Sequence, residues 1–479
     1  MGVLAILALV LGAAALTAPE AVALLGLGAI YLNLPGIAVS LYGVPALAAG
    51  ASMLLLAGPL AVRLLRGEPM ALDRPFLILL GFLAVVLASA FVAEDMSEAT
   101  TWLLTFLTEG VLVYFAVSNL FRTKDRLRRA LRVILLCGAL LGALTLYQEL
   151  SRTYEQQFGG LAQRNLEFFE AHEASAARDP FRPQEAIFVS NRAGGPIGEP
   201  NRFAQILLVL LPIVFFAVRN EERRKLRVAL AACGGLILAG VLLTYSRGAF
   251  VALVVLTAIL IVTRSIRIRS LALTVAALVL VLAIAAPGYL LRIATLQETP
   301  ELLGGARSSG SEEVMRSRVT EMLAAWTVFV DHPVLGVGPG QYAPVYSETY
   351  MNNPDIAFKH IDRPRRAHNL YFELAAETGI FGIACFLGMV GLIEVRLWRA
   401  WRRWKGERED LANLAAAFFL AIAGYLVSAV FLHLSYQRYY WLLLGLAAAT
   451  LHVLAAEESR AHRIRQAIAD LEGVAEPVA

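Results

Sequence analysis

One short polar segment holds the residues best suited to chemistry. His368 and Asn369 lie directly before an apolar stretch, and three arginines precede them: Arg363, Arg365 and Arg366. Histidine is the side chain whose ordinary pKa lets it accept or release a proton near neutral pH. A histidine where a polar loop meets an apolar helix can therefore serve as a base at a membrane surface. A purely structural role, with Asn369 capping the helix that follows, stays open.

Further arginines stand at the borders of apolar stretches. Arg192 precedes Gly194-Gly195-Pro196, Arg202 closes Glu199-Pro200-Asn201-Arg202, and Arg247 lies in the turn Tyr245-Ser246-Arg247-Gly248. A charge near hydrocarbon needs a partner, and the sequence around Arg247 offers no obvious carboxylate for that role. Because the guanidinium fork binds phosphate oxygens in pairs, these arginines indicate an anionic ligand such as a diphosphate. Snorkelling to lipid head groups, or pairing with a loop carboxylate, is the alternative.

The composition identifies the class of protein. Hydrophobic residues make up 58% of the chain, charged residues 17%, and mean hydropathy is +0.64. A soluble domain cannot hide that much apolar surface, so we expect an all-α polytopic membrane protein. The net charge of +4 comes from short basic loops of the kind that membrane insertion requires, and it predicts no nucleic-acid partner. Cys137, Cys233 and Cys385 lie in apolar stretches and predict core residues, not metal ligands.

The apolar stretches predict about 12 or 13 transmembrane helices, each needing roughly 20 residues to cross a bilayer. The predicted spans are 43–62, 75–93, 99–120, 128–149, 201–219, 227–245, 248–263, 270–290, 374–397, 411–434 and 437–456. Two shorter stretches, 2–16 and 20–34, form either two spans or a shallow hairpin.

Basic residues predict the orientation of these spans. Clusters follow every second span: Arg63/Arg66/Arg74, Arg122 to Arg132, Arg219 to Arg227, Arg264 to Arg269 and Arg396 to Arg408. Basic loops stay in the cytoplasm, so the segments 150–198 and 291–373 and the Tyr245 turn are expected outside. The spacing therefore predicts transmembrane helices over 1–290 with an outer loop at 150–198, a cap at 291–373, further helices over 374–456, and a cytoplasmic tail at 457–479.

The cap is expected to be partly helical. Residues 318–330 (RVTEMLAAWTVFV) have helical periodicity, and this helix begins with Arg318. Gly336, Gly338 and Gly340, together with Pro333 and Pro339, then predict a rigid turn region.

Taken in order, these motifs resemble the O-antigen ligase and O-antigen polymerase superfamily of bacterial envelope glycosyltransferases. The resemblance covers about residues 75–450. Its carriers are Arg192-Ala193-Gly194-Gly195, Pro200-Asn201-Arg202-Phe203-Ala204, Tyr245-Ser246-Arg247-Gly248-Ala249, Arg318 to Trp326 with His332-Pro333-Val334-Leu335-Gly336-Val337-Gly338, and His368-Asn369 with Glu373, Glu377, Gly379 and Gly382. Each motif is weak alone, but their order and common sidedness are specific.

The resemblance implies a membrane-embedded, GT-C-like glycosyltransferase of the bacterial inner membrane that needs no metal or other cofactor. It implies an undecaprenyl-diphosphate-linked glycan as donor and a glycan or lipid as acceptor, used on the outer face. His368 would be essential near the acceptor, and Arg202 and Arg247 would hold the diphosphate. The further substrate-binding residues expected are Arg192, Asn201, Tyr245, Ser246, Arg318, Arg363, Arg365, Arg366 and Asn369.

Three alternatives stay open at this stage. A polymerase of the same superfamily would share these residues and differ in its acceptor. A transporter of lipid-linked glycans needs charges in mid-membrane, and Glu109 is the strong mid-span acid in the sequence. A non-catalytic scaffold of envelope assembly would tolerate changes to the outer arginines and to His368.

Overall fold

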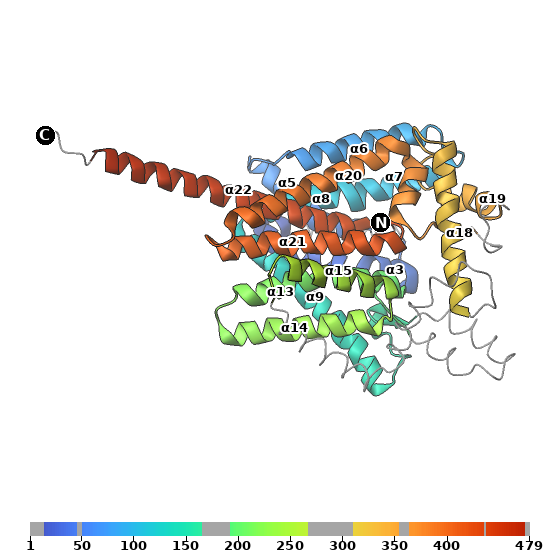
Figure 1. The fold of residues 1–479 in the computed structure, drawn as a ribbon, viewed down its shortest axis with the longest axis horizontal. Coiled ribbons are helices and arrows are strands. Elements are labelled where there is room, and N and C mark those ends of the chain that lie inside the picture. The colour runs from blue at the N-terminus through green and yellow to red at the C-terminus, as the bar shows by residue number, and fades with distance from the viewer. Residues whose placement is uncertain are drawn as a thin grey trace.

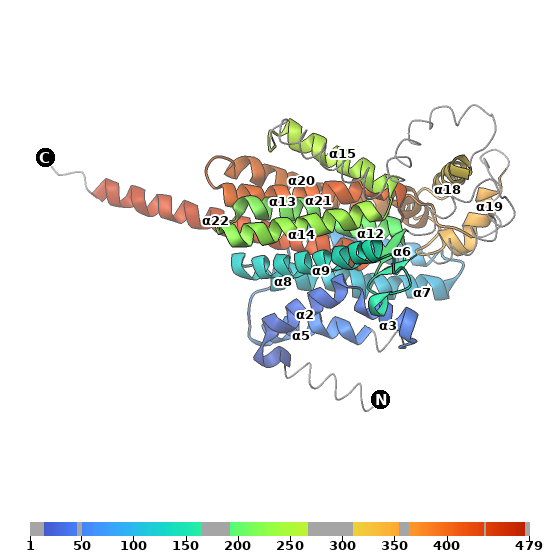
Figure 2. The same cartoon turned by 90° about the horizontal axis from the view of Figure 1, so that it is seen from below.

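The computed structural model describes residues 14–45, 50–164, 192–266, 310–353, 364–434 and 437–474. Most helices run side by side in one bundle (Figure 1). Helices α18 (Gly310–Asp331) and α19 (Ser347–Met351) lie across one end of the bundle, and α22 (Gln437–Val474) extends beyond the other (Figures 1 and 2). We refer to the end that carries α18 as the site end.

The bundle is built from the following helices: α2 (Pro19–Tyr31), α3 (Leu34–Tyr42), α5 (Leu54–Leu65), α6 (Arg74–Ala90), α7 (Met96–Thr105), η2 (Phe106–Leu112), α8 (Val113–Leu120), α9 (Lys124–Ser151), α12 (Pro200–Leu208), α13 (Leu210–Asn220), α14 (Arg224–Leu243), α15 (Arg247–Val262), α20 (Leu370–Trp404), α21 (Glu409–Ser428) and α22. Two short strands, β1 (Gln163–Arg164) and β2 (Ala193–Gly195), pair antiparallel at the site end. The all-α membrane architecture expected from the sequence is confirmed.

Seven helices in the described residues are long and apolar enough to cross a bilayer, and the bent pair α2–α3 makes an eighth. Shorter apolar helices α5, α6 and α15 coincide with further predicted spans. The predicted span 43–62 starts at a break, because Gly43 ends α3 in a left-handed conformation, and its second half contains α5 from Leu54 onwards; residues 46–49 lie outside the described residues. The predicted span 270–290 and most of 2–16 lie outside the described residues.

The predicted basic loops gather at the end opposite α18. Lys124 forms a 2.6 Å ion pair with Asp410, joining the start of α9 to the start of α21. Lys405 donates to the Thr263 carbonyl (3.2 Å), which joins the end of α20 to the end of α15. These contacts place three connections of the chain, before α9, after α15 and between α20 and α21, on one face, as the alternation of charge requires.

A break in α20 shapes the site end. Gly379 has φ 64° and ψ −166°, which interrupts the helix ten residues after it begins. The carbonyls freed by the break accept from the turn region that follows α18: Val337 N donates to Ala376 O (2.9 Å) and Gly338 N to Glu377 O (3.1 Å). Backbone groups inside a membrane protein must find such partners. The break therefore docks the cap onto the bundle.

The cap is fixed by side chains as well. The Gln341 amide exchanges two hydrogen bonds with the backbone of Asp95, at 2.8 and 2.9 Å, just before α7. The hydroxyl of Tyr342 donates to the Glu321 carbonyl in α18 (3.0 Å). The helix expected at 318–330 is confirmed as part of α18, and Gly336, Gly338 and Gly340 all have positive φ, as a glycine-built turn region requires.

Replacing Gly379 with alanine is expected to destabilise the protein by at least about 2 kcal/mol, because a side chain strains the left-handed conformation. A Cβ at this position would lie 2.1 Å from the Val334 carbonyl oxygen. Gly388→Ala in the same helix is the matched control, since a Cβ there meets nothing within 4 Å. Thermal unfolding in detergent measures both variants. Equal melting temperatures would show that the break does not dock the cap.

Candidate functional site

His368 lies at the site end, in a strained turn immediately before α20. Its φ of 47° is a left-handed conformation that non-glycine residues seldom adopt and that gathers at functional sites. The side chain of Glu373 holds the turn, accepting from Ala367 N (2.8 Å) and pairing with Arg366 Nε (2.9 Å). The helix cap predicted for Asn369 is confirmed, because its Oδ1 accepts from Tyr371 N and Phe372 N at the start of α20, each at 3.0 Å.

The imidazole of His368 has one buried face and one accessible edge. Its side chain is 33% exposed, yet Nδ1 is buried and has no hydrogen-bond partner in the part of the chain described. Nε2 lies 3.8 Å from Oε2 of Glu321, a residue of α18 that is 1% exposed. Nε2 is thus the ring nitrogen that a substrate can reach, and a carboxylate stands next to it.

The surroundings keep His368 uncharged. Burial lowers the pKa of its imidazole to about 3, and the positive charges of Arg318, Arg202, Arg365 and Arg366 act in the same direction. Two of these arginines are paired, Arg365 with Glu321 (3.3 Å) and Arg366 with Glu373. Arg318 forms no ion pair with a described residue. A neutral imidazole inside a cluster of cations can accept a proton, and the cations around it attract an anion.

Arg202 reaches this cluster from the first turn of α12. The side chain of Glu199 caps that helix, accepting from Asn201 N (3.0 Å) and Arg202 N (2.8 Å). Asn201 in turn accepts from Arg192 through Oδ1 (2.8 Å). Arg202 is 4% exposed, with Glu199 3.9 Å from its Nε. A capped helix start therefore fixes a buried guanidinium near His368.

The Tyr245 turn joins the site through Arg192, whose Nε donates to the Thr244 carbonyl (2.9 Å). Ser246 caps α15 by accepting from Ala249 N (3.3 Å), and Arg247 is the first residue of that helix. A Cβ at Gly248 would lie 3.3 Å from the ring of Phe431, so the turn rests against the segment that follows α21. Tyr245 itself has a left-handed φ of 52°.

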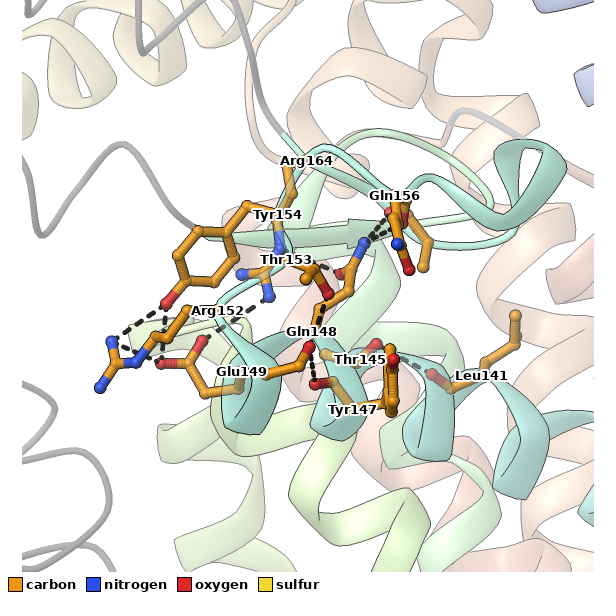
Figure 3. Close-up of polar contacts among 12 residues, drawn as sticks. Leu141, Thr145, Tyr147, Gln148, Glu149, Arg152, Thr153, Tyr154, Gln156 and Arg164 are labelled. Carbon is orange, nitrogen blue, oxygen red and sulfur yellow. Dashed lines mark hydrogen bonds and ion pairs between the residues drawn. The ribbon is translucent and has the colours of Figure 1, made fainter.

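A second polar cluster supports this turn (Figure 3). Arg164 of β1 donates to Gln148 Oε1 (3.1 Å), lies 3.6 Å from Glu149 Oε2, and stands 4.8 Å from the centre of the Tyr154 ring. β1 pairs with β2, which follows Arg192 directly. Burial raises the pKa of Tyr245 well above its ordinary value, and the nearby Glu149 carboxylate adds to this effect. The cluster therefore lies against the arginine-bearing turn.

Three side chains hold the end of α21 between the helix of Arg202 and the helix that follows His368. Gln205 of α12 donates to Ser428 Oγ (2.9 Å), and Tyr371 of α20 donates to the Leu426 carbonyl (2.8 Å). The cap residue Asn369 donates to the Val430 carbonyl (3.0 Å). The chain then leads directly to His433, whose ring centre lies 5.6 Å from that of His368. The end of α21 thus borders the site, together with α12 and α20.

The family model described as O-antigen ligase matches residues 234–387. This part of the chain is similar to the O-antigen ligase family, and the match supports the resemblance that the sequence motifs indicate. The matched region covers the second half of α14, then α15, α18, α19 and the first part of α20, and so includes Arg247, Arg318 and His368. The match supports a membrane glycosyltransferase-like role as ligase or polymerase. No curated protein matches the chain.

In this O-antigen ligase-like chain, most residues predicted for the site come together. Arg192 and Asn201 are bonded to each other; Arg202, Arg318, Arg365 and Arg366 surround His368; and Tyr245, Ser246 and Arg247 form the adjoining turn. Arg363 lies outside the described residues. Glu109 takes no part in the site, because it pairs with Arg438 at 3.2 Å. No described group of three or more His, Cys, Asp or Glu residues is placed to hold a metal ion.

Three residues of this region were not predicted from the sequence as site residues. Glu321 follows Arg318 by one helical turn, a spacing that puts both on one side of α18. His433 falls at the border of the last two apolar stretches, where its polarity is the available signal. Arg164 stands without any motif in the segment predicted as an outer loop, so only the pairing of β1 with β2 reveals it.

The depressed pKa predicts that His368 stays neutral in the ligand-free protein from about pH 8 down to about pH 5, below the ordinary histidine value of about 6.5. Nuclear magnetic resonance of ring-¹⁵N-labelled histidine reads the protonation state directly. Arg318→Gln removes one of the charges that disfavour the imidazolium and is expected to raise the pKa of His368. Arg403→Gln, which alters an exposed arginine near the opposite end, is the control. Titration of His368 near pH 6.5 in the wild type would contradict the prediction.

Proposed function

We propose that the protein is an inverting glycosyltransferase that moves a glycan from undecaprenyl diphosphate to an acceptor hydroxyl, as O-antigen ligases do. The observation that carries this proposal is a strained histidine beside a buried carboxylate, with arginines of α12, α18 and the segment before α20 close enough to lower the pKa of its imidazole. We place the reaction on the outer face of the bacterial inner membrane, because the basic loops lie at the opposite end of the bundle.

The proposed reaction is a single displacement. The acceptor oxygen bonds to the sugar C1 as the bond from C1 to the phosphate oxygen breaks, and undecaprenyl diphosphate leaves with the electron pair. Nε2 of His368 takes the proton of the attacking hydroxyl, and the nearby Glu321 carboxylate stabilises the imidazolium that forms. Diphosphate needs no protonation to leave, so no second acid is required.

Arg202, Arg247 and Arg318 are proposed to bind the diphosphate. Fixed cations stabilise the charge that develops on a leaving phosphate, and removing one such group typically costs about 10²- to 10³-fold in rate. Arg192 and Asn201 position the start of α12, while Arg365 and Arg366 keep Glu321 and Glu373 in place. Ligase and polymerase activities differ here in the acceptor alone, which we propose the cap selects.

His368→Ala is expected to reduce glycan transfer by about 10²-fold or more, because the base is lost. Arg247→Ala and Arg202→Ala are expected to do the same through the leaving group, while Arg202→Lys keeps the charge and retains part of the activity. The assay uses purified protein, an undecaprenyl-diphosphate glycan, and either a lipid acceptor or a second lipid-linked glycan.

His462→Ala and Arg403→Ala are matched controls, because both residues lie away from the site end. Transfer to the lipid acceptor supports the ligase; chain growth on the second lipid-linked glycan supports the polymerase. Transfer by His368→Ala and Arg247→Ala at wild-type rates would refute the mechanism. Movement of labelled donor across proteoliposomes without any acceptor would favour a transporter instead.

A further inference from the structure

His433 is a second histidine of the site, and its position is built into the fold. It follows η6 (Ala429–Phe431) and leads towards α22. Three hydrogen bonds, from Gln205, Tyr371 and Asn369, fix the chain just before it. Two of the donors belong to the segment 369–371 that follows His368. These hydrogen bonds thus fix the position of the His433 backbone relative to that of His368.

Both imidazoles have the same buried atom without a partner. Nδ1 of His368 and Nδ1 of His433 are each shielded from solvent and form no hydrogen bond with the described residues. A buried polar atom left unpaired costs about 1–3 kcal/mol, so two such atoms in neighbouring rings call for an explanation. A neutral imidazole carries a hydrogen on one nitrogen and a lone pair on the other, so one ring can satisfy its neighbour.

The separation of the rings suits such a bond. A linear N–H···N bond of about 2.9 Å, with about 1.1 Å from each nitrogen to its ring centre, puts the centres about 5.1 Å apart. The observed centres are 5.6 Å apart, with ring planes at 80°. The hydrogen and the lone pair lie in their own ring planes, so rings twisted about the N–N line can still bond.

We propose that His433 is a positioning residue for the base: its Nδ1 accepts a hydrogen bond from Nδ1–H of His368, which leaves the lone pair of His368 on Nε2. This inference rests on the proposed function of His368. In this tautomer the basic nitrogen is the accessible one beside Glu321, where the acceptor hydroxyl must come. His433 carries its own hydrogen on Nε2 and takes up no proton in the reaction.

The charges around His433 favour this arrangement. Burial lowers the pKa of His433 well below its ordinary value, and Arg202, Arg366 and His368 act in the same direction. The ring is therefore uncharged and keeps a lone pair for the bond. A carboxylate in its place would pair with the arginines and compete with the diphosphate for them. A neutral acceptor orients the base and leaves the positive charge for the donor substrate.

The test compares three variants of the full-length protein. His433→Ala removes the acceptor atom and is expected to lower kcat about 10- to 100-fold, because the base then populates the wrong tautomer. The KM for the lipid-diphosphate donor should stay within about twofold of the wild type, since binding is left to the arginines. His433→Asn places an amide oxygen close to the position of Nδ1 and should recover most of the kcat. His433→Leu fills the space without an acceptor and should resemble the alanine variant.

Ring-¹⁵N spectra supply a readout that a structural role would not change. In the wild type, Nδ1 of His368 should carry the hydrogen and Nε2 should not; in His433→Ala the two forms should mix. An unaltered His368 spectrum, a kcat within about threefold of wild type, or an effect on donor KM alone would each overturn the proposal. If a variant fails to fold, the wild-type spectrum still decides, because hydrogen on Nε2 contradicts the proposed tautomer.

The outcomes separate this inference from the proposed function. If His368→Ala is inactive and His433→Ala is fully active, only the proposed pairing of the two histidines is refuted. If His368→Ala is active, His368 is not the base, and both proposals are refuted. His462→Ala, which changes an exposed histidine of α22, controls for the loss of an imidazole elsewhere.

Discussion

Burial of arginine charge is the constraint on which the site end depends. Arg164, Arg192 and Arg202 are all less than 10% exposed. A buried cation is tolerated only when hydrogen-bonded groups or carboxylates surround it, and each of these arginines has such neighbours. The carboxylates involved are Glu149 beside Arg164 and Glu199 beside Arg202. The more exposed Arg365 and Arg366 pair with Glu321 and Glu373. Because those groups come from different segments, pairing the arginines also fixes how the segments meet.

This arrangement strains the backbone at three residues. His368 and Tyr245 both adopt left-handed conformations, and Gly379 interrupts α20. Such conformations persist only where the surroundings hold them. At His368 the Asn369 cap and the Glu373 side chain do so, while at Tyr245 the Arg192 bond to Thr244 holds the turn. The strained residues are thus neighbours of the arginines proposed to bind the substrate.

Periodicity and charge alternation predicted the helices well, since both follow from the bilayer itself. The start of α12 was readable too, because Pro200 follows a residue able to cap a helix. The break at Gly43, where a predicted span begins, was not readable from the sequence, because apolar residues continue on both sides of it. His433 and Glu321 escaped notice for a different reason. The local signals, one helical turn from Arg318 and a polar residue between two apolar stretches, are weak, because each residue becomes part of the site through contacts between segments distant in sequence.

The arginine cluster has a consequence for the order of events. Burial and the positive charge of the arginines hold the pKa of His368 far below neutrality, so its imidazole is by itself a weak base. A bound diphosphate brings negative charge next to the same arginines and offsets their effect, and an opposite charge within about 4–6 Å favours the imidazolium. Under the proposed function, the base therefore gains strength only when the donor is in place. A hydroxyl or water that enters the site before the donor meets a histidine too weak to activate it.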